Sequence, residues 1–496
     1  MAPKLWFENL AFSASSPFQI AMLPLLLALL AVAWFVTVIR TYSRPPLPPG
    51  PRGLPLVGSL PFLQPHLHHY FSTLAGIYGP IVSVRLGSKL CVVVNSASLA
   101  KEVLKDQDAI LGNHLETDRV RAVRKGGQGL GWVNYSSQWR ELRKLAVSEI
   151  LNSTKLDTFK DLWREEIRHM VKLVHGKINS PVNFEELILA TVLNVTTGML
   201  LGFCKVRHLR IFSCSSAVRL AGSGAAHRRI GHEAPPDFRR GDRSTARNVQ
   251  IWRDLCSEGF SAVAATDVGG KRRPEVAPYK VSHQSKLHGP DNGQRRHHHG
   301  HDGVGDDKTA ATPESLRKAQ EEAEKVVGKD HIVEEIHLSQ LKYLNAVIKE
   351  TLRLHPPTPV MLPRTPREAC TVGGYLVPKK SLVFVNMQTI QRDPQVWDNP
   401  SEFRPERFLS GTTKWDYNGN NLHFFPFGSG RRICIGLAVA DRMLTYMLAS
   451  LLHSFEWNLP GGSRIEILET PGINVKKFTP LLAVPTPRFS VPELYF

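Results

Sequence analysis

The chain has 496 residues, of which 42% are hydrophobic, enough for one large core or several domains. Its six cysteines form no CxxC pair, which argues against a disulfide framework or a structural zinc site and fits a reducing compartment. The net charge of +18 would suit an anionic partner, but eight of these charges fall within residues 205–310, so charge alone is weak support for a nucleic-acid binder.

An apolar run occupies residues 20–39, with Thr37 as its one clearly polar member. A helix of that length spans roughly 30 Å, one hydrocarbon thickness. A cleaved signal peptide is the alternative, but its apolar core is usually shorter and ends at a small-residue cleavage site. Three arginines follow the run, while only Lys4 and Glu8 precede it, which places the bulk of the chain in the cytosol. Residues 1–43 are therefore predicted to be an uncleaved, single-pass membrane anchor.

The next segment, residues 44–58, is rich in proline and cannot be helical. Proline fixes φ and favours the extended polyproline II conformation. The segment is predicted to be a stiff hinge that holds a catalytic domain, residues 59–496, above the membrane.

Apolar periodicity beyond the hinge indicates a mainly α protein with a small β subdomain, an α+β fold. Residues 79–106 are predicted to form two short strands and then a helix, and residues 138–172 have helical periodicity. Residues 336–354 form an amphipathic pattern that two prolines end, and residues 371–386 have the pattern of short strands.

The most informative run, FPFGSGRRICIG, lies at residues 425–436. It contains the pattern Phe-x-x-Gly-x-Arg-x-Cys-x-Gly at Phe427, Gly430, Arg432, Cys434 and Gly436. Glycines beside a cysteine allow the backbone to approach a flat ligand, and a neighbouring arginine can neutralise a carboxylate on that ligand. An apolar helical pattern follows Cys434, so a helix start is expected to lower the pKa of the thiol. For a lone cysteine, a buried and inert side chain in a turn would be the usual alternative.

This run closely resembles the haem-binding loop of the cytochrome P450 family. The resemblance implies haem b (iron protoporphyrin IX) as cofactor, with Cys434 as the axial thiolate ligand of the iron. It further implies that Arg432 holds a haem propionate, that Phe427 packs beside the sulfur, and that Gly430 and Gly436 give the loop its close fit to the cofactor.

Further family motifs occur in the expected order. The Glu-x-x-Arg pair is Glu350 and Arg353, and Arg407 in FRPERF would complete a buried, structural network, although without the other motifs an exposed ion pair would be the more common interpretation of Glu350 and Arg353. The resemblance also implies propionate contacts from a second set of residues: Trp139, Arg143 and Arg364. The anchor and hinge match microsomal, plant-type members, and the resemblance covers about residues 40–203 and 313–496.

The family pattern breaks between residues 204 and 312. The family places a long central helix here, with an Asp-Thr-Thr pattern that delivers protons to bound dioxygen, and no such run is present, so no catalytic residue is identifiable. The composition of this segment predicts disorder. Residues 287–308 can be back-translated and read one nucleotide later as an apolar run with Ala-x-x-Asp-Thr-Thr, which suggests a reading-frame slip. The His-rich tract within it, GQRRHHHGHD, is assigned no evolved function, although it can bind metal adventitiously.

The resemblance implies a haem-thiolate monooxygenase in the endoplasmic reticulum membrane, with its catalytic domain in the cytosol. It would hydroxylate a small apolar metabolite, of terpenoid or flavonoid type, with electrons from NADPH through NADPH-cytochrome P450 reductase, and would have no nucleic-acid partner. One alternative is a haem-thiolate isomerase or dehydratase, which needs no external electrons. Another is a non-functional remnant that lacks the oxygen-activating helix.

Overall fold

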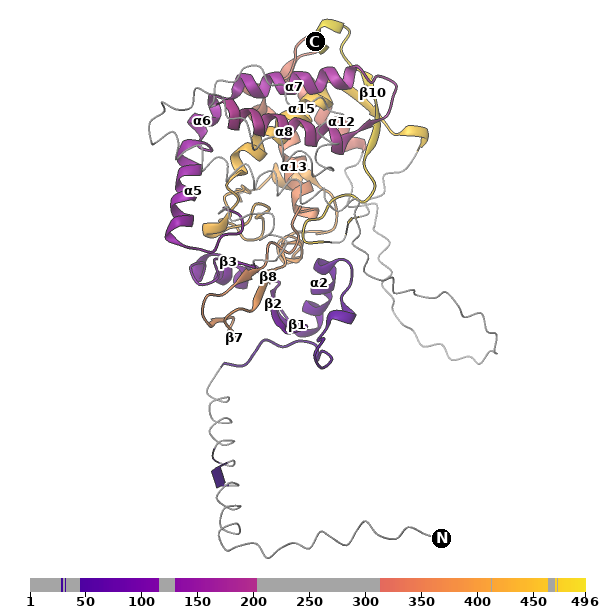
Figure 1. The fold of residues 1–496 in the computed structure, drawn as a ribbon. Coiled ribbons are helices and arrows are strands. Elements are labelled where there is room, and N and C mark those ends of the chain that lie inside the picture. The colour runs from indigo at the N-terminus through magenta and orange to yellow at the C-terminus, as the bar shows by residue number, and fades with distance from the viewer. Residues whose placement is uncertain are drawn as a thin grey trace, which may run out of the picture.

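The computed structural model describes about two thirds of the chain (Figure 1). The described residues are 28, 29, 32, 45–115, 130–202, 313–411, 413–462, 469–470 and 472–496. The predicted membrane run at 20–39 lies outside them apart from three single residues, and so does the segment 204–312. Within the described parts, no helix is both long and apolar enough to span a bilayer.

Helices contain more of the described residues than strands do, and Figure 1 shows α7, α8, α12 and α15 gathered at one end of the described chain. The main helices are α2 (Leu67–Tyr78), α3 (Ala97–Lys101), α5 (Ser137–Glu149), α6 (Ser153–Asp157), α7 (Lys160–His175), α8 (Phe184–Gly202), α12 (Pro313–Val327), α13 (Lys342–Leu354), α14 (Met387–Ile390) and α15 (Leu437–Ser454). The short helical turns are η1 (Leu60–Phe62), η2 (Glu102–Asp106), η5 (Glu335–Gln340), η6 (Pro405–Phe408), η7 (Gly430–Arg432), η8 (Pro460–Gly462) and η9 (Pro492–Tyr495).

The main helical core lies where α7, α13 and α15 meet. On α7, Trp163, Ile167 and Met170 follow three-to-four spacing and are almost fully buried. They join a cluster that includes Ile348 of α13 and Met447 of α15. This packing joins α13, which carries the Glu-x-x-Arg pair, to α15, which begins directly after the cysteine loop.

Three small sheets complete the part of the fold that the structure describes. The largest has the strand order β1 (Ile81–Leu86), β2 (Lys89–Val94), β8 (Leu382–Val385), β5 (Arg364–Thr365), β3 (Asn113–His114). The second has the order β4 (Val182–Asn183), β10 (Leu482–Pro487), β9 (Phe455–Asn458), and the third pairs β6 (Cys370–Val372) with β7 (Tyr375–Val377). β1 and β2 form an antiparallel hairpin, while β2 and β8 pair in parallel, which brings distant segments into one sheet.

The predicted fold class, mainly helical with small sheets, is confirmed, as are the two strands and helix within 79–106 and the strands within 371–386. The single helix predicted for 336–354 is wrong in its first part. The chain forms η5, and the helical conformation is then interrupted at Leu341, which has φ −80° and ψ 69°, before α13 begins. An apolar pattern alone cannot reveal this break, because Leu341 is fully buried and keeps the periodicity.

The proline-rich hinge contacts the domain near its start, at residues 46–49. The backbone N–H and the hydroxyl of Ser83 on β1 donate to the carbonyls of Pro49 and Pro48, each at 2.7 Å. The N–H of Leu376 donates to the carbonyl of Pro46 at 2.9 Å. Residues 46–49 of the predicted hinge therefore contact the folded domain directly.

Candidate haem-thiolate site

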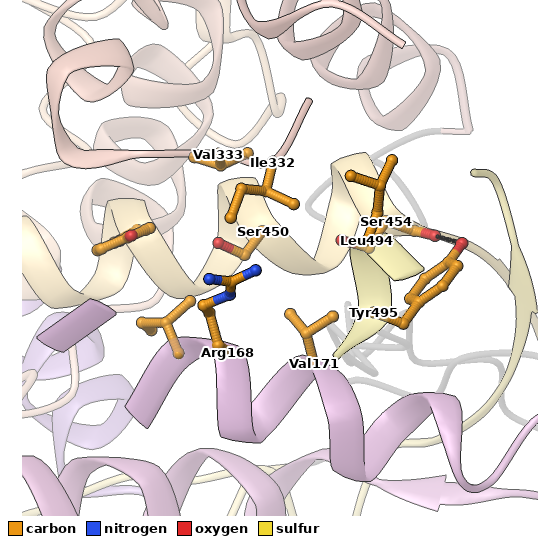
Figure 2. Close-up of a pocket in the computed structure, with 10 residues that line it drawn as sticks. Arg168, Val171, Ile332, Val333, Ser450, Ser454, Leu494 and Tyr495 are labelled. Carbon is orange, nitrogen blue, oxygen red and sulfur yellow. Dashed lines mark hydrogen bonds between the residues drawn. The ribbon is translucent and has the colours of Figure 1, made fainter. Parts of the chain in front are cut away.

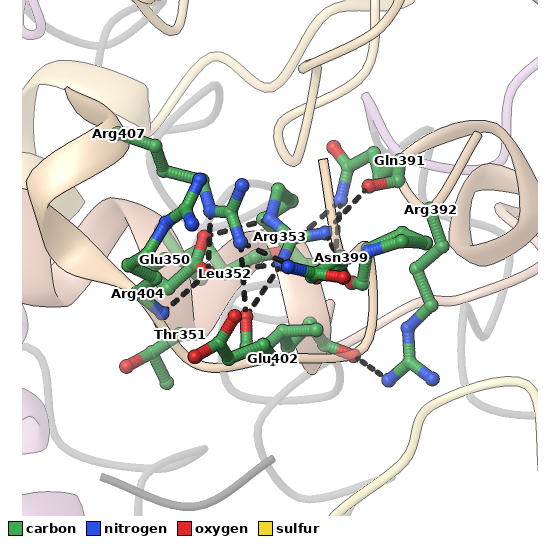
Figure 3. Close-up of polar contacts among 12 residues, drawn as sticks. Glu350, Thr351, Leu352, Arg353, Gln391, Arg392, Asn399, Glu402, Arg404 and Arg407 are labelled. Carbon is green, nitrogen blue, oxygen red and sulfur yellow. Dashed lines mark hydrogen bonds and ion pairs between the residues drawn. The ribbon is translucent and has the colours of Figure 1, made fainter. Parts of the chain in front are cut away.

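Glu350 lies at the centre of a buried network of arginines on α13 and η6 (Figure 3). Arg353 binds it in a bidentate manner, with Nε 2.6 Å from Oε2 and Nη2 2.9 Å from Oε1, and both side chains are fully buried. The Nε of Arg407 donates to Oε1 at 3.1 Å, and the backbone N–H of Arg404 donates to the same oxygen at 2.9 Å. Because both carboxylate oxygens accept hydrogen bonds, the burial of these charges is compensated.

Gln391 connects this network to the cysteine loop. It is fully buried, its carbonyl accepts from Nη1 of Arg353 at 3.0 Å, and its side-chain Nε2 donates to the carbonyls of Leu352 and Arg353. Its Oε1 accepts the N–H of Phe425, at the start of the loop, at 2.9 Å. Gln391 was not predicted from the sequence, because no motif marks a residue whose role depends on contacts with two distant segments.

The loop that carries Cys434 is shaped by glycines. Gly430 has φ +70°, and a Cβ there would lie 1.8 Å from the carbonyl oxygen of Leu104, so only glycine fits. A Cβ on Gly436 would lie 3.9 Å from the sulfur of Cys434, which shows how closely the backbone passes the thiol. The N–H of Cys434 donates to the carbonyl of Phe427 at 2.9 Å, and the loop closes on itself just before α15 begins.

The thiol of Cys434 is at the surface of the described residues but is crowded by protein on its loop side. Desolvation raises the pKa of the thiol, and the N–H of Gly436 and the charge of Arg143 oppose this only in part. The expectation of a lowered pKa is therefore wrong for the polypeptide alone, because the helix start and the amides do not outweigh desolvation. Such a sulfur becomes a thiolate when a metal cation binds it directly.

Arg364, on β5, is the clearest sign that an anion belongs near the cysteine loop. Its side chain is 2% exposed, and its Nη1 has no hydrogen-bond partner among the described residues. Burial lowers the pKa of its guanidinium to about 10, against the opposing charge of Asp108. Asp108 pairs instead with Arg431, 3.4 Å from its Nε. A buried cation with an unpaired donor is costly unless a negative group binds there.

Two further basic groups surround Arg364. Burial, with the charges of Arg364 and Arg143, lowers the pKa of Arg432 to about 10. Burial, with the charges of Arg432 and Arg364, lowers the pKa of His114 to about 3. His114 was not singled out in the sequence, and it reaches this cluster through the pairing of β3 with β5. The cluster therefore has an excess of positive charge that the described residues do not neutralise.

Trp139 of α5 packs against the arginines of this cluster. Its ring centroid lies 4.3 Å from the guanidinium carbon of Arg432 and 5.5 Å from that of Arg143, and its Nε1 donates to the carbonyl of Leu130 at 2.9 Å. Nη2 of Arg143 donates to the carbonyl of Ile433, next to the cysteine, at 2.6 Å. Arg432 donates to three backbone carbonyls, those of Gly112, Leu130 and Val133. α5 and the cysteine loop are thus held together.

The residues present fit haem. The thiol of Cys434, which a bound metal cation would ionise, lies beside the cation cluster around Arg364, which bound carboxylates would neutralise. Haem contains one iron and two propionates, so it supplies both kinds of group. The small pocket drawn in Figure 2 lies elsewhere, between α7 and α15, and is lined by residues such as Arg168, Ser450 and Tyr495. It shares no residue with the cysteine loop or the cation cluster.

Comparison with known proteins identifies the class to which this fold and site belong. The sequence model of the cytochrome P450 family matches residues 48–210 and 309–483. Residues 211–308, which it leaves unmatched, lie within the segment where the predicted resemblance breaks. The fold resembles a solved zebrafish cytochrome P450 structure with a TM-score of 0.60, at 21% identity, over 85% of this chain and 99% of that one.

The chain belongs to the cytochrome P450 family. It is 33% identical to cytochrome P450 76C2 of Arabidopsis thaliana, over 94% of this chain and 98% of that protein. It is 31% identical to the flavonoid 3'-monooxygenase of Petunia hybrida, over 91% and 95% of the two chains, and to the desmethyl-deoxy-podophyllotoxin synthase of Sinopodophyllum hexandrum, over 93% and 96%. The predicted identification as a plant-type cytochrome P450 of the monooxygenase class is confirmed.

Proposed function

We propose that this chain is a haem-thiolate monooxygenase that hydroxylates a small apolar metabolite of the terpenoid or flavonoid type. The observation that carries the proposal is the buried cation cluster around Arg364. The Nη1 of Arg364 has no hydrogen-bond partner among the described residues, and its charge acts on Arg432 of the cysteine loop. The substrate class is supported by relatives named for plant metabolites, the flavonoid 3'-monooxygenase and the podophyllotoxin-type synthase.

In this proposal the described residues bind and position haem b. Cys434 would ligate the iron as a thiolate, and the N–H of Gly436 would tune the electron density on the sulfur. Arg364, Arg432 and Arg143 would hold the propionates, and Trp139 packs against Arg432 and Arg143. When bound, haem would supply the activation of dioxygen, and a thiolate ligand from Cys434 would favour it by donating electron density.

The Glu350 network has a positioning role in the proposal and touches no substrate. It fixes Gln391, and Gln391 fixes the start of the cysteine loop through the N–H of Phe425. Since all these groups are buried and hydrogen-bonded, the loop is held in one conformation before the cofactor binds.

Electrons are proposed to come from NADPH through a membrane-bound reductase, with the chain anchored in the endoplasmic reticulum membrane by residues 1–43. Exposed Arg140 and Lys144 of α5, with half-exposed Arg431 of the cysteine loop, provide a basic surface beside the proposed haem site. Such a surface suits an acidic electron donor, because complementary charge speeds association and orients the partner.

The segment 204–312 is proposed to result from a reading-frame slip that replaced the proton-delivering helix. The interval 211–308 left unmatched by the family supports this proposal. Sequencing of the transcript tests it: a message that encodes the segment in its present frame, with no upstream slip, would overturn it. If the segment is expressed as printed, the isomerase or dehydratase reaction is the second candidate, because it needs neither external electrons nor the Asp-Thr-Thr pattern.

The proposed activity is tested by turnover of the full chain in membranes with added reductase. Oxygenated product that depends on NADPH, dioxygen and the reductase is expected when terpenoid and flavonoid panels are supplied. Conversion of hydroperoxides without NADPH would instead support the isomerase or dehydratase reaction, and absence of haem incorporation would support the remnant.

A further inference from the structure

Four histidines gather around one carboxylate where the start of α2 meets residue 469. Nε2 of His68 lies 3.3 Å from Oε2 of Glu469, and Nδ1 of His355 lies 3.4 Å from its Oε1. The rings of His66 and His69 pack against that of His68, with centroid distances of 5.8 and 4.2 Å. Residues from three distant parts of the sequence therefore meet at this point, which is separate from the cysteine loop.

The ring nitrogens in this cluster are not satisfied by the surrounding protein. The side chain of His68 is 1% exposed, and its Nδ1 has no hydrogen-bond partner among the described residues. Nδ1 of His66 is likewise buried without one. Buried polar atoms are rarely left without partners, so a missing ligand is the natural explanation.

The three groups are arranged as metal ligands. One ring nitrogen from each of His66 and His68 and one carboxylate oxygen of Glu469 all lie within 4.8 Å of one another. Zinc binds imidazole nitrogens and carboxylate oxygens at about 2.0–2.2 Å, so a modest inward shift would bring all three into contact with one ion. A proton shared between His68 and Glu469 could join only those two side chains and would leave His66 without a partner.

We propose that His66, His68 and Glu469 form a binding site for a divalent transition metal of the zinc type. His355, on the other carboxylate oxygen, would orient Glu469 toward the metal, as outer hydrogen bonds do at known sites. The guanidinium of Arg392 is near Glu469 and opposes a dication, so binding is expected to be weaker than at a site without it. Neither haem nor the proposed activity is required for this binding.

A metal here would fasten the loop from residue 469 to 477 to α2. Glu469 forms a β-bridge with Lys477, and the N–H of Thr470 donates to the carbonyl of Lys476 at 2.8 Å. The N–H of Val475 donates to the carbonyl of Pro357 at 2.9 Å, so the loop also contacts the segment after α13. Metal binding is therefore expected to slow hydrogen exchange of the amides of Thr470 and Val475.

The experiment must first remove the His-rich tract, which lies outside the described residues and can bind metal by itself. The parent is the full chain with His297, His298, His299 and His301 changed to asparagine. Zinc alone is the probe, its binding is measured by equilibrium dialysis, and hydrogen exchange is followed with and without it. We expect one equivalent of zinc per parent chain, with slower exchange across residues 469–477.

His66→Asn is the sharpest variant, because His66 is the N-cap residue of α2 and makes no capping hydrogen bond with its side chain. Asparagine is a favoured N-cap, so the helix is kept while the imidazole is removed. This variant and Glu469→Gln should weaken zinc binding at least about tenfold, a loss of about 1.4 kcal/mol. The control is His169→Asn on the exposed surface of α7, which should bind as the parent does.

Equal zinc binding by the parent, His66→Asn and Glu469→Gln would overturn the proposal, and so would exchange rates at 469–477 that zinc leaves unchanged. The unfolding midpoint of each variant in the presence of a chelator checks that the chain is folded. His66→Asn should match the parent in that measurement and differ from it only when zinc is added.

Discussion

The guanidinium of Arg432 lies 4.3 Å from the ring centroid of Trp139, so a residue two positions before Cys434 is packed on α5. The contact joins two motifs that are nearly 300 residues apart in the chain. It belongs to a cluster in which Arg364 keeps an unpaired buried donor. A bound anion would compensate this buried charge, so the effect of each residue of the cluster on cofactor retention can be tested separately.

Replacing Arg364 should weaken cofactor retention without destabilising the polypeptide that lacks haem. Arg364→Gln removes a buried charge that the protein does not pair, so the unfolding midpoint of the haem-free chain should stay the same or rise. Hydrogen bonds to charged groups contribute about 1.5–3 kcal/mol, which corresponds to haem dissociation faster by roughly tenfold or more. Haem transfer to apomyoglobin measures that rate. If Arg364→Gln releases haem at the same rate as the parent, Arg364 does not contribute to binding the cofactor.

Breaking the Glu350 network should be strongly destabilising. Glu350→Gln leaves the fully buried guanidinium of Arg353 without its counter-charge, which costs about 3–5 kcal/mol in the free energy of unfolding. Glu321→Gln is the matched control, because Glu321 pairs with Arg317 on the exposed surface of α12 and should show little change. Denaturant unfolding compares the two, and similar losses in both would contradict the network's role.

Gln391 is expected to position the cysteine loop against the Glu350 network. Gln391→Leu keeps the size of the side chain but removes the acceptor for the N–H of Phe425, an unsatisfied buried donor that costs about 1–3 kcal/mol. Haem content should fall with stability, while Gln395→Leu on the exposed surface should change neither. If Gln391→Leu loses stability but incorporates haem normally, the residue supports the core and not the loop.

The haem-free chain should lose stability in mild acid because of His114. Burial and the neighbouring arginines lower the pKa of His114 from its ordinary value of 6.5 to about 3 in the folded chain. The unfolded chain therefore binds the additional proton first, so this stability is present above pH 6.5 and is lost as the pH falls from about 6.5 toward 3. His114→Gln should flatten the profile in that range, by at most about 1.4 kcal/mol per pH unit. If His114→Gln has the same slope of stability against pH as the parent across this range, the predicted role of His114 is contradicted.

The sequence predicted the loop glycines, Cys434 and the arginines of the site because each belongs to a motif with fixed spacing. Gln391 and His114 could not be predicted in this way. The first acts through backbone groups of α13 and of residue 425, and the second reaches the cluster through strand pairing between residues about 250 positions apart. The fold class followed from periodicity, but the break at Leu341 and the docking of Pro48 on β1 depend on packing that a local pattern does not record.

The central claim, that Cys434 is the thiolate ligand of haem iron, is tested most directly by the spectrum of the reduced, carbon-monoxide-bound full chain. The chain should incorporate haem and show the strongly red-shifted Soret band of a thiolate ligand. Cys434→Ser should lose that band, while Cys370→Ser, at a buried cysteine on β6, should keep it. A full chain that incorporates haem but lacks the band, or a Cys434→Ser variant that retains it, would contradict the claim.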